Sequence, residues 1–370
     1  MKSLRRLVSI ASTAALLAVS MLGVTACDNR QELIIYNWGE YIAEDTIAKF
    51  EAAYPQYKVI YRTFETNETM YPNLDNTYDV IIPSEYMVCR LINEQRLQPL
   101  DMSLLPNVTA NMDPMFNTMT YSQDEELSNE VLDYAIPYLY CTVGLVYDAN
   151  RIDLPEGTTD PAVIWSVLFD EANAGNIGMY DSMRESIGVA LNYLGYSINS
   201  MNEDELAEAM QLLIDQKTNI NPTYGVDNLK DKMASGEMAA SVAWSGDHIV
   251  MLDRIAELGG NDDIDLRFVL PEGSNWSVDM MCIPSNAANY EGAHDFINFM
   301  YEPEIALENC EYVGYSTPNV AAREMLDPDI SGNVYYYPTV EIFETLEVYY
   351  SSSEYEERYT EIWNTVKASA

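Results

Sequence analysis

The sequence predicts an α/β protein in which sheets carry helices on both faces. Short runs typical of buried strands alternate with helix-like periods through most of the chain. This β-α-β-α order is typical of parallel sheets covered on both sides. The same alternation of strands and helices occurs in an N-terminal and a middle part of the chain. Two sheets facing each other would leave a cleft between them. No tandem repeat or low-complexity tract interrupts the pattern.

The N-terminal part of the pattern begins with a strand predicted at residues 32–38 (ELIIYNW). A second strand is predicted at 57–64, and the segment 43–54 between them has Ile47, Phe50 and Tyr54 on one helical face. A buried strand at 78–84 and a helix at 86–95 complete this part. The order therefore predicts a first β-α-β-α unit.

The middle and later parts repeat the alternation. Strands are predicted at 176–182, 237–244, 266–273 and 278–285, and helices at 184–197, 203–217, 226–236 and 291–303. The helix at 203–217 has acidic residues in its first turn, which suits the positive end of a helix. The helix at 184–197 is expected to stop near Gly195.

Residues 1–26 are expected to be a secretory signal and to lie outside the fold. Lys2, Arg5 and Arg6 precede an apolar stretch, and small residues lead to Cys27. The ending Val24-Thr25-Ala26-Cys27 resembles a bacterial lipobox, in which the cysteine is acylated. We therefore expect a lipidated Cys27, a short tether over 27–31, and an extracytoplasmic protein held to the cell membrane by this anchor alone, since no other run approaches the ~20 apolar residues of a membrane span.

The charge balance excludes nucleic acid as a partner. The signal contains three of the 19 Lys and Arg residues and none of the 59 Asp and Glu residues, so its removal moves the formal net charge from −40 to −43. Nucleic-acid binding needs a basic footprint, whereas an acidic surface attracts cations.

Four cysteines follow Cys27: Cys89, Cys141, Cys282 and Cys310. They have no zinc-like spacing. Their apolar neighbours favour buried thiols, but disulfides between them remain open.

Aromatic and acidic residues gather at the ends of the predicted strands, which is where open α/β sheets bind ligands. Carboxylates form charge-assisted hydrogen bonds with ammonium groups, and aromatic rings bind cations through their faces and cover methylenes. These residue types therefore predict a site for a desolvated organic cation such as an alkyl polyamine. The residues at strand ends are Trp38, Glu40, Tyr41, Ser84, Tyr86, Asp181, Ser182, Glu185, Trp244 and Asp247.

A series of motifs resembles the polyamine (spermidine/putrescine)-binding proteins of bacterial ABC importers, members of the extracellular solute-binding proteins. The motifs are IIYNWGEYI, TFETNETMYPNL, YDVIIPSEYMV, LGYS, VGYSTPNVAAREML and YYP, in this order, and the likeness extends from Leu33 to the C-terminal helix. The resemblance implies a type II periplasmic-binding-protein fold with two lobes, each with a mixed sheet flanked by helices, and a ligand cleft between them. The ligand-binding residues it implies are Trp38, Glu40, Tyr41, Ser84, Tyr86, Ser182, Glu185, Trp244, Asp247, Asp279, Tyr315 and Tyr349.

Departures from the family pattern leave the choice between putrescine and spermidine open. Gly39 stands where relatives often have a hydroxyl residue, and Ser182 stands where the spermidine-preferring pattern has an acid. Ser277 replaces an aromatic residue, and Trp276 is shifted by one position. Since adjacent strand residues point to opposite faces, Trp276 would need a bulge to reach the ligand.

The resemblance also implies a lobe 1 over 32–138 and 272–335, a lobe 2 over 139–271, and C-terminal helices over 336–370 that pack mainly on lobe 2. We expect a monomer that delivers its ligand to a membrane permease and needs no metal or cofactor. An enzyme is disfavoured because GxSxG, HExxH, GxGxxG and P-loop patterns do not occur. A receptor for another organic cation such as thiamine, or less readily a carbohydrate-active enzyme, remains an alternative. Glu85 is expected on a solvated surface, and Glu68 is expected to stabilise a turn.

Overall fold

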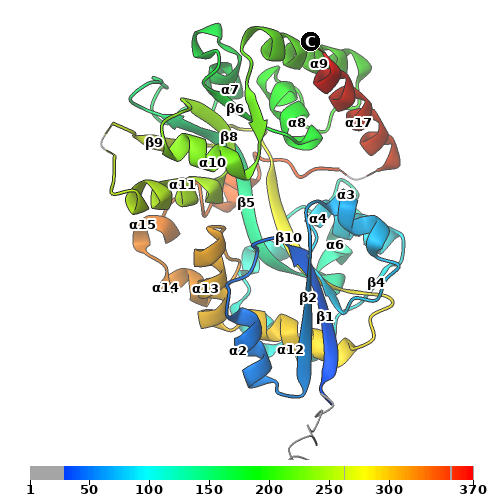
Figure 1. The fold of residues 1–370 in the computed structure, drawn as a ribbon. Helices are drawn as coiled ribbons and strands as arrows, with labels where there is room; N and C mark the ends of the chain where they lie inside the picture. The colour runs from blue at the N-terminus through cyan, green and yellow to red at the C-terminus, as the bar shows by residue number, and fades with distance from the viewer. Residues whose placement is uncertain (1–28, 262, 351, 370) are drawn as a thin grey trace, which may run out of the picture.

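Two strands run between two lobes in the computed structural model, which describes residues 29–261, 263–350 and 352–369. Strands β5 (Ala135–Asp148) and β10 (Trp276–Pro284) lie at the junction in Figure 1. β5 pairs with β10 as far as Thr142, and from Val143 onward it pairs with strands of the other lobe. The predicted signal and Cys27 lie outside the described residues.

The strands form one hydrogen-bonded path, β2-β1-β3-β10-β5-β8-β6-β7, with β4 beside β10 and β9 beside β5. The two sheets that the sequence predicts are thus joined through β5. The remaining strands are β1 (Gln31–Trp38), β2 (Tyr57–Phe64), β3 (Val80–Ile81), β4 (Leu97–Gln98), β6 (Ile177–Tyr180), β7 (Thr223–Gly225), β8 (Ala240–Trp244) and β9 (Leu266–Val269).

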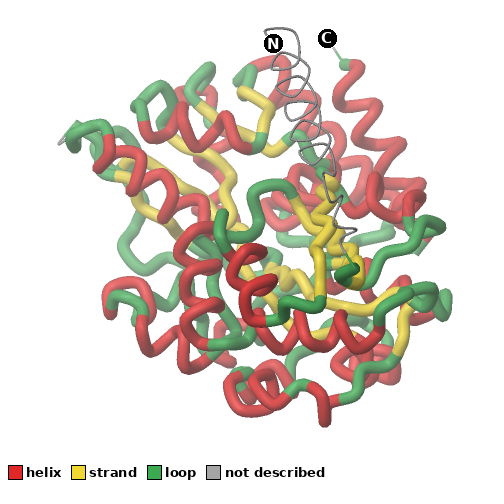
Figure 2. The backbone as a smooth tube through the Cα atoms, turned by 60° about the horizontal axis from the view of Figure 1, so that its bottom comes forward, coloured by secondary structure: helices red, strands yellow, loops and turns green. Residues whose placement is uncertain are grey.

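Helices surround the strands on the outside of both lobes (Figure 2). Helix α17 packs on α8 and α9 of lobe 2. The α-helices are α2 (Thr46–Ala53), α3 (Asn67–Met70), α4 (Glu85–Asn93), α5 (Pro106–Asn111), α6 (Glu125–Tyr134), α7 (Pro161–Phe169), α8 (Met183–Tyr193), α9 (Glu203–Asn219), α10 (Asp227–Ala234), α11 (Ser245–Glu257), α12 (Tyr290–Met300), α13 (Pro303–Val313), α14 (Val320–Met325), α15 (Pro328–Ser331), α16 (Val340–Phe343) and α17 (Ser353–Ala368).

The predicted elements of the β-α-β-α alternation are present, and the α/β fold class is confirmed. β1 and β2 pair in parallel so that Trp38 lies opposite Phe64 at their carboxyl ends. Helix α8 is followed by Gly195 at φ +83°, a left-handed conformation that favours glycine and ends the helix as expected. β3 is shorter than predicted, since only Val80 and Ile81 form its ladder with neighbouring strands, and Ser84 adds an isolated bridge to β10.

β5 is not among the strands that the sequence predicts. All 14 of its residues are buried, so it lacks the alternation of polar and apolar residues that marks a half-exposed strand. Pro137 within the run also argues against a central strand. In the structure Pro137 lies opposite Met280, where the β10 register shifts.

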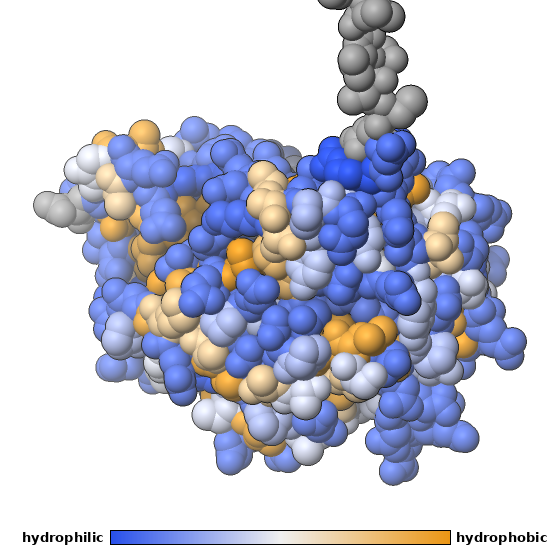
Figure 3. All heavy atoms as spheres, turned by 90° about the horizontal axis from the view of Figure 1, so that it is seen from below, coloured by the Kyte–Doolittle hydropathy of each residue, from blue (hydrophilic) through white to orange (hydrophobic). Residues whose placement is uncertain are grey.

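The outer surface agrees with the acidic composition. Hydrophilic residues dominate the face seen from below, and the hydrophobic areas on it are small and separate (Figure 3). Among the described residues, no helix combines the length and apolar character needed to cross a membrane.

Candidate functional site

Asp279 lies at the centre of the residues that the sequence predicts for the site. It stands in β10 where the pairing with β5 shifts register, and its backbone forms a bridge with Ser84. Its Oδ2 accepts a hydrogen bond of 2.7 Å from the Tyr41 hydroxyl, and its Oδ1 accepts one of 2.7 Å from the Ser84 hydroxyl. The ends of three separate segments of lobe 1 therefore meet at one carboxylate.

The charge on Asp279 has no cationic partner within the part of the chain that the structure describes. Among the described residues, no Lys or Arg forms an ion pair with this carboxylate. Burial raises the pKa of Asp279 from 3.8 to about 6, against the lowering effect of the Tyr41 and Ser84 hydroxyls. Asp279 is half-buried. A carboxylate that is shielded from water without a counter-charge is costly, so an external cation would relieve this cost.

Aromatic rings continue from Asp279 across the junction between the lobes. The Tyr41 ring lies edge-on to Trp38 at 6.5 Å and to Tyr315 at 5.7 Å between ring centroids. Tyr315 in turn lies 6.4 Å from Trp244, which stacks on Tyr180 at 4.4 Å. Trp38, Tyr315 and Trp244 are only partly buried. The rings form a wall that draws on both lobes.

A glycine permits the close approach of the two lobes at this wall. Gly246 lies in the first turn of α11, and a Cβ there would stand 2.2 Å from Cδ1 of Tyr315 and 2.6 Å from the Gly314 carbonyl oxygen. Gly314 itself ends α13 at φ +82° and directs the chain into Tyr315. The sequence WSGD therefore needs its glycine for packing.

Asp247 is buried in lobe 2, in the first turn of α11. Its Oδ2 accepts a hydrogen bond of 2.6 Å from the Tyr180 hydroxyl, which also accepts one of 2.8 Å from the Trp244 backbone amide. Its Oδ1 lies 3.4 Å from Nζ of Lys230. Burial raises the pKa of Asp247, although Lys230 and Tyr180 both lower it. Tyr180 and Lys230 were not predicted as site residues.

Glu185 and Ser182 lie together at the start of α8. The Ser182 hydroxyl donates a hydrogen bond to Glu185, and burial raises the pKa of this carboxyl. Tyr349 is buried against the same helix, since a Cβ on Gly188 would lie 3.1 Å from its hydroxyl oxygen. Burial, with Glu185 as the next cause, raises the pKa of Tyr349. The structure thus brings Ser182, Glu185 and Tyr349 to one place.

Tyr86 is close to Ser84, but one of its faces is already covered. Asn67 donates hydrogen bonds to Ser84 Oγ at 3.1 Å and to the Tyr86 hydroxyl at 2.8 Å. The guanidinium of Arg184 lies 4.2 Å from the centre of the Tyr86 ring. Arg184 also approaches Glu68 at 3.4 Å and Glu356 at 3.5 Å, which links α8 to lobe 1 and to α17.

One expectation about this region is wrong, and two cations beside the site were not predicted. Arg184 and Lys230 contact predicted site residues. Glu85 was expected on a solvated surface, but it is 0% exposed and its Oε2 accepts hydrogen bonds from the Ser277 hydroxyl at 2.7 Å and the Val278 amide at 3.0 Å. Its placement in the first turn of α4, beneath β10, explains the burial.

The structure also answers two questions that the sequence left open. Trp276 is buried away from the aromatic wall, with Tyr121 at 6.1 Å and Phe343 at 5.2 Å. The register shift in β10 comes after Asp279 and does not redirect Trp276. The four cysteines of the described chain are free and buried: Cys89, Cys141, Cys282 and Cys310.

The comparison with protein families decides the classification. The model for the bacterial extracellular solute-binding proteins matches residues 45–334, which include both lobes and most of the site. The chain belongs to this family. The fold expected from the resemblance is confirmed with it.

Other members of the solute-binding family are similar over nearly their whole length. The spermidine/putrescine-binding periplasmic protein of Escherichia coli K12 is 32% identical over 357 residues, covering 94% of this chain and 96% of the relative. A putative spermidine/putrescine ABC transporter structure from Listeria monocytogenes has a TM-score of 0.77 at 36% identity, covering 91% of this chain and 99% of that one. The spermidine/putrescine substrate-binding protein PotD of Streptococcus pneumoniae has a TM-score of 0.73 at 35% identity, with coverages of 91% and 98%.

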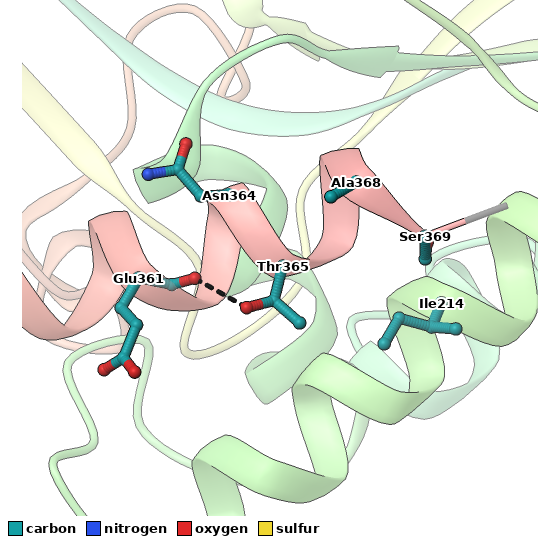
Figure 4. Close-up of a pocket in the computed structure, with 6 residues that line it drawn as sticks. All are labelled: Ile214, Glu361, Asn364, Thr365, Ala368 and Ser369. Carbon is teal, nitrogen blue, oxygen red and sulfur yellow. Dashed lines mark hydrogen bonds between the residues drawn. The ribbon is translucent and has the colours of Figure 1, made fainter.

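A hollow on the outside of this solute-binding protein does not fit an organic cation. It lies between α9 and α17 and is lined by Ile214, Glu361, Asn364, Thr365, Ala368 and Ser369 (Figure 4). It has one carboxylate and no aromatic ring.

Glu40 is exposed beside the aromatic wall, at φ +52°, and its contact with a ligand stays a prediction.

Proposed function

We propose that this solute-binding protein captures a polyamine, putrescine or spermidine, between its lobes outside the membrane and delivers it to an ABC permease. The observation that carries the proposal is Asp279. Its carboxylate is oriented by the hydroxyls of Tyr41 and Ser84, has no cationic partner among the described residues, and adjoins a wall of aromatic rings.

The chemistry of this arrangement suits an alkyl ammonium ion. A protonated amine would donate to Asp279, and the rings of Trp38, Tyr315 and Trp244 would cover the adjoining methylenes. Each cation–π contact is worth about 0.5–2 kcal/mol, and the ion pair adds a charge-assisted hydrogen bond. Glu185, with Ser182, is a second carboxylate that could receive the other end of the ligand.

The relatives support the same substrate class. The names of the Escherichia coli, Listeria and Streptococcus proteins all refer to spermidine and putrescine, and a 29% identical relative from Pseudomonas aeruginosa is named as a putrescine-binding periplasmic protein. The chain would then act as a receptor that carries out no chemistry on its ligand.

Ligand binding would favour the closed arrangement of the lobes. The aromatic wall draws on lobe 1 through Tyr41 and on lobe 2 through Trp244, so a ligand between them contacts both lobes only when they are close. A ligand shifts a conformational equilibrium by its differential affinity for the two states. We infer that the permease recognises this closed form, and that a lipidated Cys27 holds the monomeric receptor at the membrane.

The test is a calorimetric titration of the mature domain with putrescine, cadaverine, spermidine, spermine and thiamine. Binding of a polyamine, with an increase in melting temperature, supports the proposal, because a ligand that binds only the native state must stabilise it. Binding of thiamine alone would assign another organic cation. The absence of heat and of stabilisation with every amine would refute the proposal.

A further inference from the structure

We propose that Lys230 is a specificity-determining residue, whose ammonium group occupies Asp247 in place of a ligand amine and so restricts the site to a diamine. This inference rests on the proposed function and deepens it. It follows from the way in which the carboxylates of the site are already paired within the chain.

Helices α10 and α11 pack against each other (Figure 1). Lys230 of α10 reaches Asp247 in the first turn of α11. Its Nζ lies 3.4 Å from Asp247 Oδ1 and 2.8 Å from Asp227 Oδ1. The Lys230 side chain is 16% exposed, the Asp247 side chain is 3% exposed, and the Asp227 side chain is 81% exposed. The contact with Asp247 is therefore the shielded one, where electrostatic interactions are strong.

The charge state of the pair supports this arrangement. Burial alone would lower the pKa of Lys230, but Asp247 and Asp227 outweigh it and raise the pKa above its ordinary value. The ammonium therefore stays charged at neutral pH. Asp247 also accepts a hydrogen bond from the Tyr180 hydroxyl, so one of its oxygens contacts Tyr180 and the other contacts Lys230. An incoming ammonium would have to displace Lys230 or share the carboxylate with it.

Few carboxylates then remain for a ligand. Glu68 pairs with Arg184, and Glu85 is turned beneath β10 towards Ser277. Of the buried or half-buried acids at the site, Asp279 and Glu185 form no ion pair with a Lys or Arg of the described chain. Two available carboxylates suit the two ammonium groups of putrescine, whereas a third ammonium of spermidine at Asp247 would meet the positive charge of Lys230.

The experiment compares putrescine and spermidine binding by calorimetry in the wild type and in Lys230→Met. Lys232→Met is the matched control, since Lys232 lies on the same helix and pairs with the exposed Glu237. We expect the wild type to bind putrescine more tightly than spermidine. Like charges in contact repel each other, so Lys230→Met should raise spermidine affinity relative to putrescine by about tenfold or more, while Lys232→Met leaves the ratio unchanged.

Two further variants test whether the charge of Lys230 and the carboxylate of Asp247 act together. In Lys230→Met/Asp247→Asn the gain for spermidine should disappear, because the freed carboxylate is absent. Lys230→Gln keeps a hydrogen-bond donor towards Asp247 without the charge, so it should show the same gain and keeps the inference testable if Lys230→Met does not fold. An unchanged ratio in folded Lys230→Met or Lys230→Gln, a gain that persists in the double variant, or a wild-type preference for spermidine would overturn the inference. If the wild type binds no amine at all, the proposed function fails instead.

Discussion

Replacement of Glu85 by glutamine should stabilise the protein at neutral and alkaline pH. Glu85 is fully buried, and its Oε2 accepts hydrogen bonds from the Ser277 hydroxyl and the Val278 backbone amide. Its Oε1 has no hydrogen-bond partner among the described residues. The side-chain amide of glutamine keeps an acceptor oxygen for both donors and cannot ionise. The substitution therefore removes the charge that burial disfavours and places an amide nitrogen where Oε1 stands, a change that is the same at every pH.

The size of the effect follows from the pKa. Burial raises the pKa of Glu85 from 4.5 to about 7, which corresponds to about 3 kcal/mol. Below pH 4.5 the carboxyl is protonated in the folded and unfolded states, and its ionisation costs nothing. As the pH rises towards 7, the unfolded state ionises first and the folded state loses stability; above pH 7 the loss is complete.

Urea unfolding of the wild type and Glu85→Gln between pH 4.5 and 8.5 measures this directly. The difference in unfolding free energy between the two proteins should grow by about 3 kcal/mol in favour of the variant over this range. Glu130→Gln, at an exposed position on α6, is the control and should show no such growth. A difference between wild type and Glu85→Gln that does not change with pH would refute the reasoning.

Three further predictions concern the site and the contact between the lobes. Because the pKa of Asp279 is raised to about 6, putrescine affinity measured by calorimetry should fall about tenfold between pH 7.5 and pH 5, and a flat profile would contradict the proposed ion pair. Gly246→Ala should lower the free energy of unfolding, measured in urea, by about 1–3 kcal/mol. Gly39→Ala, with no atom within 4 Å of the added Cβ, should lower it less. Equal unfolding midpoints of the two variants would contradict the packing account. Arg184→Met should lower the melting temperature and weaken putrescine binding, since the buried guanidinium links the lobes. Arg358→Met is the control, because it removes exposed ion pairs worth about 0–1 kcal/mol. Equal effects of the two substitutions would exclude a role of Arg184 in holding the lobes together.

Local patterns predicted most of the strands and helices because each depends on residues close in sequence. The positions of β1 and β2 and the end of α8 near Gly195 follow from such patterns. β5 was missed for a physical reason: a strand buried on both faces has no alternation, and Pro137 suggested an interruption. The strand on which the two lobes depend is thus the one with the weakest local signal.

The sequence predicted residues that the structure brings together, but not how they pair with other side chains, and their contact with a ligand stays a prediction. The resemblance identified Asp279, Tyr41 and Ser84, and the structure joins them by hydrogen bonds. Lys230 was missed because its partner Asp247 lies on another helix, and no local pattern indicates that contact. Arg184 directly precedes Glu185, so the DSMRE segment did contain a sign that a cation lies near the site.

The burial of Glu85 illustrates a related limit. An acid at the start of a helix is usually exposed and favoured by the helix dipole, and the sequence around Glu85 fits that expectation. Only the position of β10 above the first turn of α4 removes the carboxyl from water. Contacts between segments far apart in the chain therefore decide which carboxylates are available to a ligand.

The most direct test of the central claim is the binding of putrescine and spermidine to Asp279→Asn, measured by calorimetry beside Asp253→Asn. Asparagine keeps the shape of the side chain and removes the charge. Its one oxygen still accepts from one of the two hydroxyls of Tyr41 and Ser84, and the other hydroxyl must rotate to accept from the amide nitrogen. Asp253 is exposed on α11. The account predicts that Asp279→Asn folds and loses at least about a hundredfold in affinity, the size expected when a buried charge pair is broken, and that Asp253→Asn binds as the wild type does. Polyamine binding of wild-type strength in Asp279→Asn would contradict it.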